Sequence, residues 1–245
     1  MKGNFRIIAG PCAIESRDQI IRIAKQLKDI GVDALRGGAF KPRTRPDSFQ
    51  GLKDEGIEYL IEAKKETGLP IVTELLTIEQ VKKYGNKIDA IQIGSRNMYN
   101  YELLKVAGSL DKPVILKRGF CASYKEWLSA SEYIKLAGNN KVILCERGIR
   151  CFETETRNVL DLQAIPYIKK NSDLPIIVDP SHAAGNNYMI QSMSLAATSA
   201  GCDGLMIEVH DRPEEALCDK EQCITIEQLS NICKKVIKIR EIENL

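Results

Sequence analysis

Residues able to bind metal ions or anions follow the short apolar segments of this chain. Each segment ends at, or a few residues before, a cysteine, a histidine, a carboxylate or a cation. In chain order these residues are Cys12, Arg36, Glu74, Arg96, Lys117 with Arg118, Glu146 with Arg147, Asp179 with His182, and Glu208 with His210. One charge after one segment is ordinary surface chemistry, but the recurrence after every segment predicts one shared site.

Three of these residues, with one more, could hold a single divalent metal ion. Cys12 follows Gly-Pro, His182 lies in Asp-Pro-Ser-His, Glu208 ends an apolar run, and Asp219 lies in the loop beyond it. A thiolate, an imidazole and two carboxylates suit Mn²⁺, Fe²⁺, Co²⁺ or Zn²⁺ better than Mg²⁺. His210 is an alternative ligand or a site neighbour, because strand alternation would place it on the same face as Glu208.

A second group of residues predicts binding of phosphate. Arginine binds phosphate oxygens in a bidentate manner, and lysine adds a compact charge. So many cations facing one site would repel one another unless anions filled it, which favours two phosphorylated ligands. The candidate cations are Arg36, Lys41, Arg43, Arg96, Lys117 and Arg147, with Gly37, Gly38 and Thr44 offering close backbone approach or a hydroxyl donor.

The elements that position these residues alternate between short β-branched runs and longer segments of helical period. This pattern is typical of βα units around a parallel sheet. We expect strands at 6–9, 34–37, 71–74, 90–93, 114–117, 142–146, 176–179 and 205–209. Eight units predict a (β/α)8 TIM barrel, with residues 1–245 as one domain and the site at the C-terminal ends of the strands. A doubly wound open sheet is the competing architecture, but no GxGxxG or P-loop follows any run.

Composition excludes several other classes of protein. The 245 residues are 44% hydrophobic, which is ample for a core, and the net charge of +2 gives no field that would attract nucleic acid or a membrane surface. The N-terminus has no long apolar leader, so we expect a cytoplasmic protein. The cysteines are scattered without a CxxC pair, which does not suggest a disulfide scaffold. Apart from Cys12, we interpret them as small hydrophobes or bystanders: Cys121, Cys145, Cys151, Cys202, Cys218, Cys223 and Cys233.

The motifs themselves resemble those of 3-deoxy-D-arabino-heptulosonate 7-phosphate (DAHP) synthases over nearly the whole chain. They appear in the same order as the expected strands. The matching segments are Gly-Pro-Cys-Ala-Ile-Glu-Ser at 10–16, Leu-Arg-Gly-Gly-Ala-Phe-Lys-Pro-Arg-Thr at 35–44, Ser-Phe-Gln-Gly at 48–51, Ile-Gln-Ile-Gly-Ser-Arg-Asn at 91–97, Leu-Lys-Arg-Gly-Phe at 116–120, Leu-Cys-Glu-Arg-Gly-Ile-Arg at 144–150, Val-Asp-Pro-Ser-His at 178–182 and Glu-Val-His at 208–210.

This resemblance implies condensation of phosphoenolpyruvate with D-erythrose 4-phosphate and release of phosphate, the entry step to chorismate and the aromatic amino acids. It also implies one divalent metal ion and a homodimer or homotetramer. The chain looks like the short type I form, without an N-terminal regulatory domain. The resemblance assigns the metal to Cys12, His182, Glu208 and Asp219, phosphoenolpyruvate to Arg36, Lys41, Arg96, Lys117 and Arg147, and erythrose 4-phosphate to Arg43 and Thr44.

Two details of function remain open at this stage. Lys117 and Glu74 are candidates for handling the reacting water and its protons, alongside Cys12 and His182 as catalytic metal ligands. Arg45 and Asp47 depart from the family pattern of a small hydroxyl residue and an aromatic, so we expect this loop to differ locally in shape while the matched ligands are kept.

Three alternative functions are weighed against this one. The sister 3-deoxy-D-manno-octulosonate 8-phosphate synthases use arabinose 5-phosphate, but Lys-Pro-Arg-Thr at 41–44 favours the four-carbon aldehyde. A class I aldolase would form a Schiff base at Lys117. A barrel kept only as a binding module should have lost ligands, and none is missing.

Overall fold

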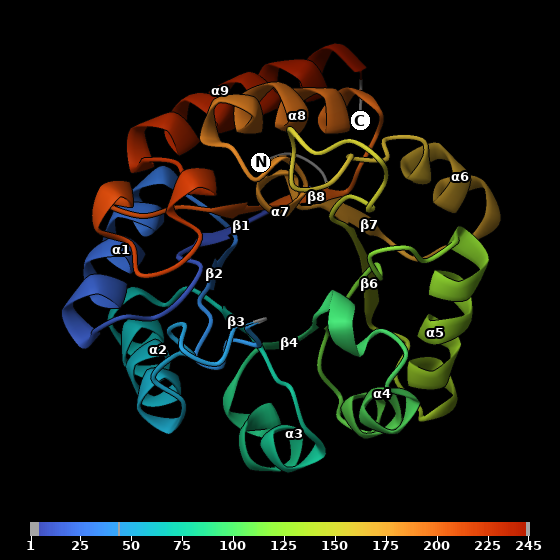
Figure 1. Ribbon diagram of the computed structural model, residues 1–245, viewed down its shortest axis with the longest axis horizontal. Coiled ribbons are helices and arrows are strands. Elements are labelled where there is room, and N and C mark those ends of the chain that lie inside the picture. The colour runs from blue at the N-terminus through green and yellow to red at the C-terminus, as the bar shows by residue number, and fades with distance from the viewer. Residues whose placement is uncertain (1–4, 44, 244–245) are drawn as a thin grey trace.

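The computed structural model describes residues 5–43 and 45–243, and within them eight parallel strands close into a barrel (Figure 1). The strands follow one another around the barrel in chain order, and β1 pairs with β8 to close it. They are β1 (Arg6–Gly10), β2 (Ala34–Arg36), β3 (Ile71–Glu74), β4 (Ala90–Ile93), β5 (Val114–Lys117), β6 (Val142–Glu146), β7 (Ile176–Val178) and β8 (Gly204–Glu208). The predicted TIM barrel is confirmed, and no predicted strand end is wrong by more than one residue.

Helices form a ring around the strands (Figure 1). The α-helices are α1 (Arg17–Ile30), α2 (Asp54–Thr67), α3 (Ile78–Tyr84), α4 (Tyr101–Gly108), α5 (Tyr124–Leu136), α6 (Ala164–Asn171), α7 (Pro180–Ala184), α8 (Asn187–Ser199) and α9 (Ile226–Glu243). Short 3₁₀ turns complete the set: η1 (Gly85–Lys87), η2 (Ser95–Asn97), η3 (Pro213–Glu215) and η4 (Lys220–Gln222). None of the helices in these described residues is long and apolar enough to cross a membrane.

Local sequence explains where the helices begin and end. In α1, the Ser16 side chain accepts a hydrogen bond from the backbone of Gln19, and Gly31 ends the helix in the left-handed conformation with φ of 83°. Both residues are standard signals at helix ends. At the N-terminal end the Ser16 oxygen satisfies a free backbone N–H, and at the C-terminal end glycine adopts positive φ without strain. Between them α1 buries an apolar face against the barrel.

The hydrophobic core has two layers. One lies inside the barrel, where every strand contributes one side chain: Ile8, Ala34, Val72, Ala90, Ile115, Cys145, Ile177 and Met206. The other fills the space between strands and helices and contains the large buried side chains, including Trp127 and Tyr84. Because the barrel is filled, ligands can enter only at its ends.

The loop after β8 turns back over the end of that strand. The backbone N–H of Ile224 donates to the carbonyl of Glu208 at 3.1 Å, and the N–H of His210 donates to the carbonyl of Ile224 at 3.0 Å. These bonds hold residues 211–224 as a closed loop at the mouth of the barrel. Asp219 is thereby returned to the C-terminal end of β8, close to Glu208.

Candidate active site

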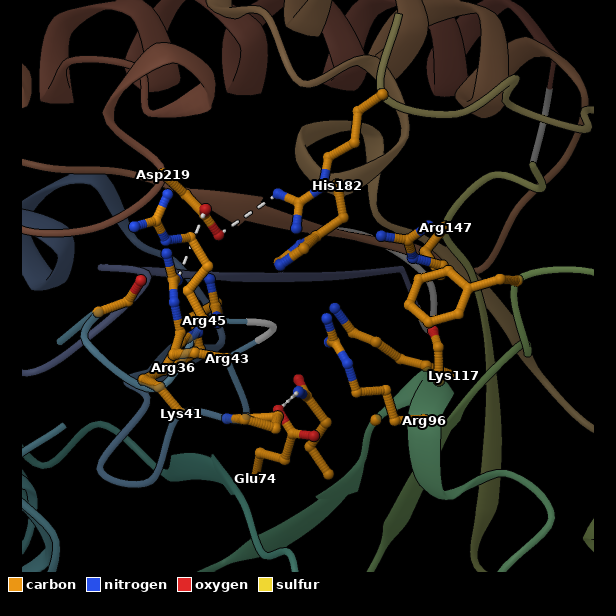
Figure 2. A pocket seen from close by; sticks show the side chains of 17 residues that line it. Arg36, Lys41, Arg43, Arg45, Glu74, Arg96, Lys117, Arg147, His182 and Asp219 are labelled. Atoms are coloured by element: carbon orange, nitrogen blue, oxygen red, sulfur yellow. Dashed lines mark hydrogen bonds and ion pairs between the residues drawn. The ribbon is translucent and has the colours of Figure 1, made fainter. Parts of the chain in front are cut away.

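A cavity of about 240 Å³ opens at the C-terminal ends of the strands, and eight of its 17 lining residues are cations (Figure 2). All the described cations that were predicted to bind phosphate line it, and so do Glu74, His182 and Asp219. Thr44 lies outside the described residues. The cations at the cavity wall are Arg36, Lys41, Arg43, Arg45, Arg96, Lys117, Arg147 and Arg157.

The four predicted metal ligands meet at one side of this cavity. The ligand atoms of Cys12, Glu208 and Asp219 all lie within 4.8 Å of one another. The Cys12 thiol donates to Asp219 Oδ2 at 3.3 Å, and His182 Nε2 lies 3.4 Å from Glu208 Oε1. The donor set is one sulfur, one imidazole nitrogen and two carboxylates. These donor types suit a borderline divalent ion, and the ligand atoms of Cys12, Glu208 and Asp219 lie close enough together to share one.

A buried carboxylate orients the histidine. Asp179 Oδ2 lies 2.7 Å from His182 Nδ1, and the other oxygen of Asp179 accepts the backbone N–H of His182 at 2.9 Å, capping α7. Because the carboxylate accepts from Nδ1, the lone pair of His182 is on Nε2, the nitrogen that faces Glu208. Burial lowers the pKa of His182 to about 4, although Asp179 and Glu208 act to raise it. The imidazole is therefore neutral near pH 7, the form that binds metal.

The other ligands are also held by charges. Arg36 is buried and donates to Glu208 Oε1 at 2.5 Å. Burial alone would raise the pKa of Glu208, but His182, Arg36 and Lys41 hold it well below its usual range. The pKa of the Cys12 thiol is raised well above its usual value by a hydrogen bond with Cys218, by burial and by Glu208. A cation beside that sulfur would reverse this effect and favour the thiolate.

Two of the cavity arginines share an aromatic neighbour. The guanidinium carbons of Arg96 and Arg147 lie 5.5 and 4.9 Å from the centre of the Phe120 ring. Such cation–π contacts fix flat guanidinium groups without neutralising them. Burial lowers the pKa of Arg147 to about 10, with Arg157 adding to the effect and Asp179 opposing it. An anionic ligand would relieve this concentration of positive charge.

Lys117 and Glu74 face the same cavity from β5 and β3. Lys117 is buried and its ammonium group donates to Asp179, the carboxylate that orients His182. Glu74 is half-buried and receives a hydrogen bond at 3.4 Å from the Gln92 amide. An ammonium and a carboxylate are thus both available beside the cations.

Other strand-end residues lie outside the cavity. Arg118 is buried beneath it, where it donates to Glu146 at 2.9 Å and to Asp161 at 2.8 Å. Glu146 in turn accepts the backbone N–H of Gly148, so this group braces the segment that carries Arg147. Both residues therefore support the site rather than line it.

The expectation that His210 faces the metal is wrong. Strand β8 ends at Glu208, so the alternation that would place His210 beside it no longer applies. His210 Nδ1 accepts the backbone N–H of Arg212, and Nε2 lies 3.0 Å from the Gln19 amide. Its ring is engaged with α1 and the following loop.

Sequence reasoning missed three contributors: Phe120, Arg157 and Gln222. Arg157 comes from the long loop between β6 and α6 and lies 3.4 Å from Asp219 Oδ2. Gln222 is buried and contacts both Glu208 and Arg157. No strand end or apolar period marks Arg157 or Gln222, whereas Phe120 closes the motif at 116–120 just after β5. The one signal available for Gln222 was that it follows Asp219 by three residues, which is one turn of a 3₁₀ helix.

The fold and the site together define a class of protein: a TIM-barrel enzyme with a metal-ligand cluster beneath an anion-binding cavity. Residues 2–243 match the DAHP synthetase I family, and the chain belongs to that family. This confirms the family and enzyme class predicted from the motifs, a DAHP synthase, the enzyme that condenses phosphoenolpyruvate with erythrose 4-phosphate in the first step of the shikimate pathway.

Individual relatives agree with this assignment. The phospho-2-dehydro-3-deoxyheptonate aldolase of Thermotoga maritima is 48% identical over 239 residues, covering 98% of this chain and 71% of the relative. A crystal structure of DAHP synthase from the same organism matches with a TM-score of 0.95 at 46% identity, covering 98% of this chain and 70% of the other. A 2-dehydro-3-deoxyphosphooctonate aldolase of Syntrophobacter fumaroxidans is 28% identical, covering 97% of this chain and 88% of the relative. A protein named for the sister activity is thus also similar to this chain, but at lower sequence identity.

Proposed function

We propose that this chain is a metal-dependent DAHP synthase in which Cys12, His182, Glu208 and Asp219 hold one divalent ion. The observation that carries the proposal is the meeting of these four side chains at the wall of a cation-lined cavity. The ion would be Mn²⁺, Fe²⁺, Co²⁺ or Zn²⁺, since a thiolate and an imidazole are poor ligands for Mg²⁺.

Phosphoenolpyruvate would be held by Arg96, Arg147 and Lys117, which come from neighbouring parts of the barrel mouth. Arg36 and Lys41 would contribute from the side next to the metal ligands. Among the described residues, Arg36 Nε is a buried donor without an acceptor, and a substrate oxygen would provide one. Fixing the enol ester in this way converts a bimolecular encounter into a positioned one.

Erythrose 4-phosphate would place its phosphate near Arg43 and Thr44. Arg43 Nη1 lies 3.7 Å from Asp219 Oδ1, so the sugar phosphate would be held beside the proposed metal ligands. Arg45 forms an exposed ion pair with Asp47 at 2.8 Å while lining the cavity. The two residues that depart from the family pattern thus support each other at the rim and leave the other ligands unobstructed.

The reaction joins C3 of phosphoenolpyruvate to the aldehyde carbon, adds water at C2, and breaks the C–O bond to phosphate. A divalent ion held by the four proposed ligands would polarise an aldehyde oxygen or a water. Lys117 and Glu74 are the groups in reach that could give or accept the protons of that water. The arginines neutralise the departing phosphate.

A class I aldolase is disfavoured by the surroundings of Lys117. A Schiff base requires the Lys117 amine to reach a substrate carbonyl, whereas its Nζ is engaged in a buried ion pair with Asp179. Borohydride in the presence of a keto substrate should therefore not attach that substrate to Lys117, and trapping there would favour the aldolase.

Phosphate release from phosphoenolpyruvate tests the activity directly. The protein is chelated, then assayed with each candidate metal and with either erythrose 4-phosphate or arabinose 5-phosphate. We expect metal-dependent release with erythrose 4-phosphate, and Cys12→Ala should abolish it without unfolding the protein. No release with erythrose 4-phosphate under any metal would refute the assignment, and faster release with arabinose 5-phosphate would favour the sister activity.

We also propose that residues 1–245 act as one catalytic domain in a cytoplasmic homodimer or homotetramer. The closed barrel formed by the described residues supports one domain, and exposed apolar side chains such as Phe152, Tyr188 and Leu217 are available for contacts between subunits. Light scattering after size exclusion tests the oligomeric state, and a monomer at micromolar concentration would contradict it.

A further inference from the structure

Gln222 is buried against Glu208, although neither the metal nor the substrate proposal uses it. It ends η4, three residues after Asp219, and only 2% of its surface is exposed. The loop that carries it is closed over β8 by the backbone bonds between Ile224 and Glu208 and between His210 and Ile224. Its side chain therefore points at Glu208 from a fixed platform.

The Gln222 amide makes one hydrogen bond in each direction. Its NH₂ group donates to Glu208 Oε2, and its carbonyl oxygen accepts from Arg157 NH1 at 2.8 Å. An ionised carboxylate only accepts and a guanidinium only donates, so the amide can be oriented in one way. A bridge between these two groups needs a donor at one end and an acceptor at the other. A glutamate here would repel Glu208, and a lysine would repel Arg157.

The bond to Glu208 has a consequence for metal binding. The terminal torsion of a glutamate has a broad energy profile, so the carboxylate plane is set by its hydrogen bonds. Arg36 holds Oε1, which also faces His182 Nε2 at 3.4 Å, and Gln222 holds Oε2. Removing either bond frees the carboxylate to rotate away from the other ligands.

The bond to Arg157 extends this effect to the cavity wall. Arg157 NH1 also lies 3.4 Å from Asp219 Oδ2, so the guanidinium links Gln222 to a second predicted ligand. Gln222 thus touches one ligand directly and another through Arg157.

We propose that Gln222 is a positioning residue of the metal centre, which fixes the carboxylate of Glu208 and holds Arg157 against Asp219. This inference rests on the proposed metal site. Gln222 itself contributes no ligand atom, because its amide is already used at both ends.

The test is the affinity and absorption spectrum of Co²⁺ bound to Gln222→Met, a variant of similar length that cannot form either hydrogen bond. Competition with a chromophoric chelator gives the dissociation constant without any substrate. We expect binding to weaken by about 10–100-fold, the usual cost of losing a partner of a metal ligand. The Co²⁺ d–d bands should also change, because Glu208 is no longer held, while the sulfur-to-cobalt charge-transfer band from Cys12 remains.

Controls separate this role from a purely structural one. Gln163→Met makes the same chemical change at an exposed position and should leave Co²⁺ binding unaltered. Urea unfolding of the metal-free proteins shows whether Gln222→Met still folds. If it does not, Gln222→Asn decides, because it keeps the amide but is too short to span both partners. Wild-type affinity and d–d bands in the deciding variant would overturn the inference.

This outcome is distinguishable from failure of the proposed function. If the wild-type protein binds Co²⁺ through Cys12 and releases phosphate from phosphoenolpyruvate, the metal site stands whatever Gln222 does. If the wild-type protein binds no Co²⁺, the proposed metal site fails first, and the inference about Gln222 fails with it.

Discussion

Asp179→Asn tests how the proposed metal ligands are oriented, because it leaves all four of them in place. Asp179 is fully buried and supplies no metal ligand in the proposed site. It caps α7, accepts from His182 Nδ1 at 2.7 Å, and accepts from the Lys117 ammonium group. Asparagine has nearly the same shape, so the change removes one negative charge and replaces an acceptor with a donor.

The consequences follow from hydrogen-bond types. The oxygen of the introduced amide could still cap α7, but its NH₂ group would then face His182 Nδ1. The imidazole would shift its proton to Nε2, the nitrogen that must bind the metal, and the ion would have to displace it. We expect metal affinity to fall by about 10–100-fold, equivalent to about 1.4–2.7 kcal/mol.

Stability should fall as well, because Lys117 loses its carboxylate partner in a buried position. Breaking a buried ion pair by removing one partner costs about 3–5 kcal/mol. The assays are chelator competition for metal affinity and urea unfolding of the metal-free protein. Asp173→Asn, at an exposed position, is the control. Wild-type metal affinity in Asp179→Asn would refute the reasoning about the imidazole proton, and unchanged unfolding would refute the reasoning about Lys117.

Three further predictions test other parts of the site. Phe120→Leu removes the cation–π contacts of the ring with Arg96, Arg147 and Arg150. The contacts with the two cavity arginines, Arg96 and Arg147, are worth about 0.5–1 kcal/mol each, so KM for phosphoenolpyruvate should rise roughly 5- to 30-fold; an unchanged KM would mean that the ring does not position these arginines. The pKa of His182 in the folded protein is about 4, below its usual value of 6.5. Between these two pH values the unfolded chain therefore binds a proton at His182 that the folded chain does not. The free energy of unfolding of the metal-free protein should consequently drop by about 3 kcal/mol as the pH falls from 6.5 to 4. His182→Gln should remove this drop, and an equal drop in that variant would assign it to other groups. In Gly94→Ala the new Cβ would overlap Glu74 Oε1, so the flexible carboxylate of Glu74 must move. We expect kcat to fall about 10–100-fold with little change in Tm. A wild-type kcat in this variant would exclude Glu74 from proton handling.

The barrel could be read from the sequence because its determinants are local. Each strand is a short apolar run with a fixed period, and each helix has its own capping signals, such as Ser16 and Gly31 around α1. The proximity of the proposed ligands Cys12 and Glu208 could be predicted for the same reason, since a barrel brings the ends of β1 and β8 together whatever the details of the loops.

The missed residues depend on how long loops return to the barrel. Arg157 is eleven residues beyond the end of β6, and Gln222 is fourteen beyond the end of β8. Their positions follow from backbone bonds such as the one from the Arg157 N–H to the carbonyl of Ala184, which no periodic pattern announces. His210 shows the same limit, because strand alternation predicts orientation only up to the residue where the strand stops.

The charges at the cavity divide into two groups, and this division indicates how the site discriminates between its ligands. On the side of the proposed metal ligands, each carboxylate already faces a cation: Glu208 faces Arg36, and Asp219 faces Arg43 and Arg157. An ion bound there would compete with those cations for the carboxylates and leave the arginines available to substrate oxygens.

On the opposite side, Arg96 and Arg147 lie against an uncharged ring, and burial with too little compensating charge lowers the pKa of Arg147 to about 10. A dianionic phosphate would gain most beside Arg147, because the neighbouring carboxylates do not offset the burial of that guanidinium. We therefore expect phosphoenolpyruvate to bind beside Phe120 even without metal, and the aldehyde to bind productively only with metal present. Isothermal titration of the metal-free protein with each substrate separately would show this order, and tight binding of erythrose 4-phosphate alone would contradict it.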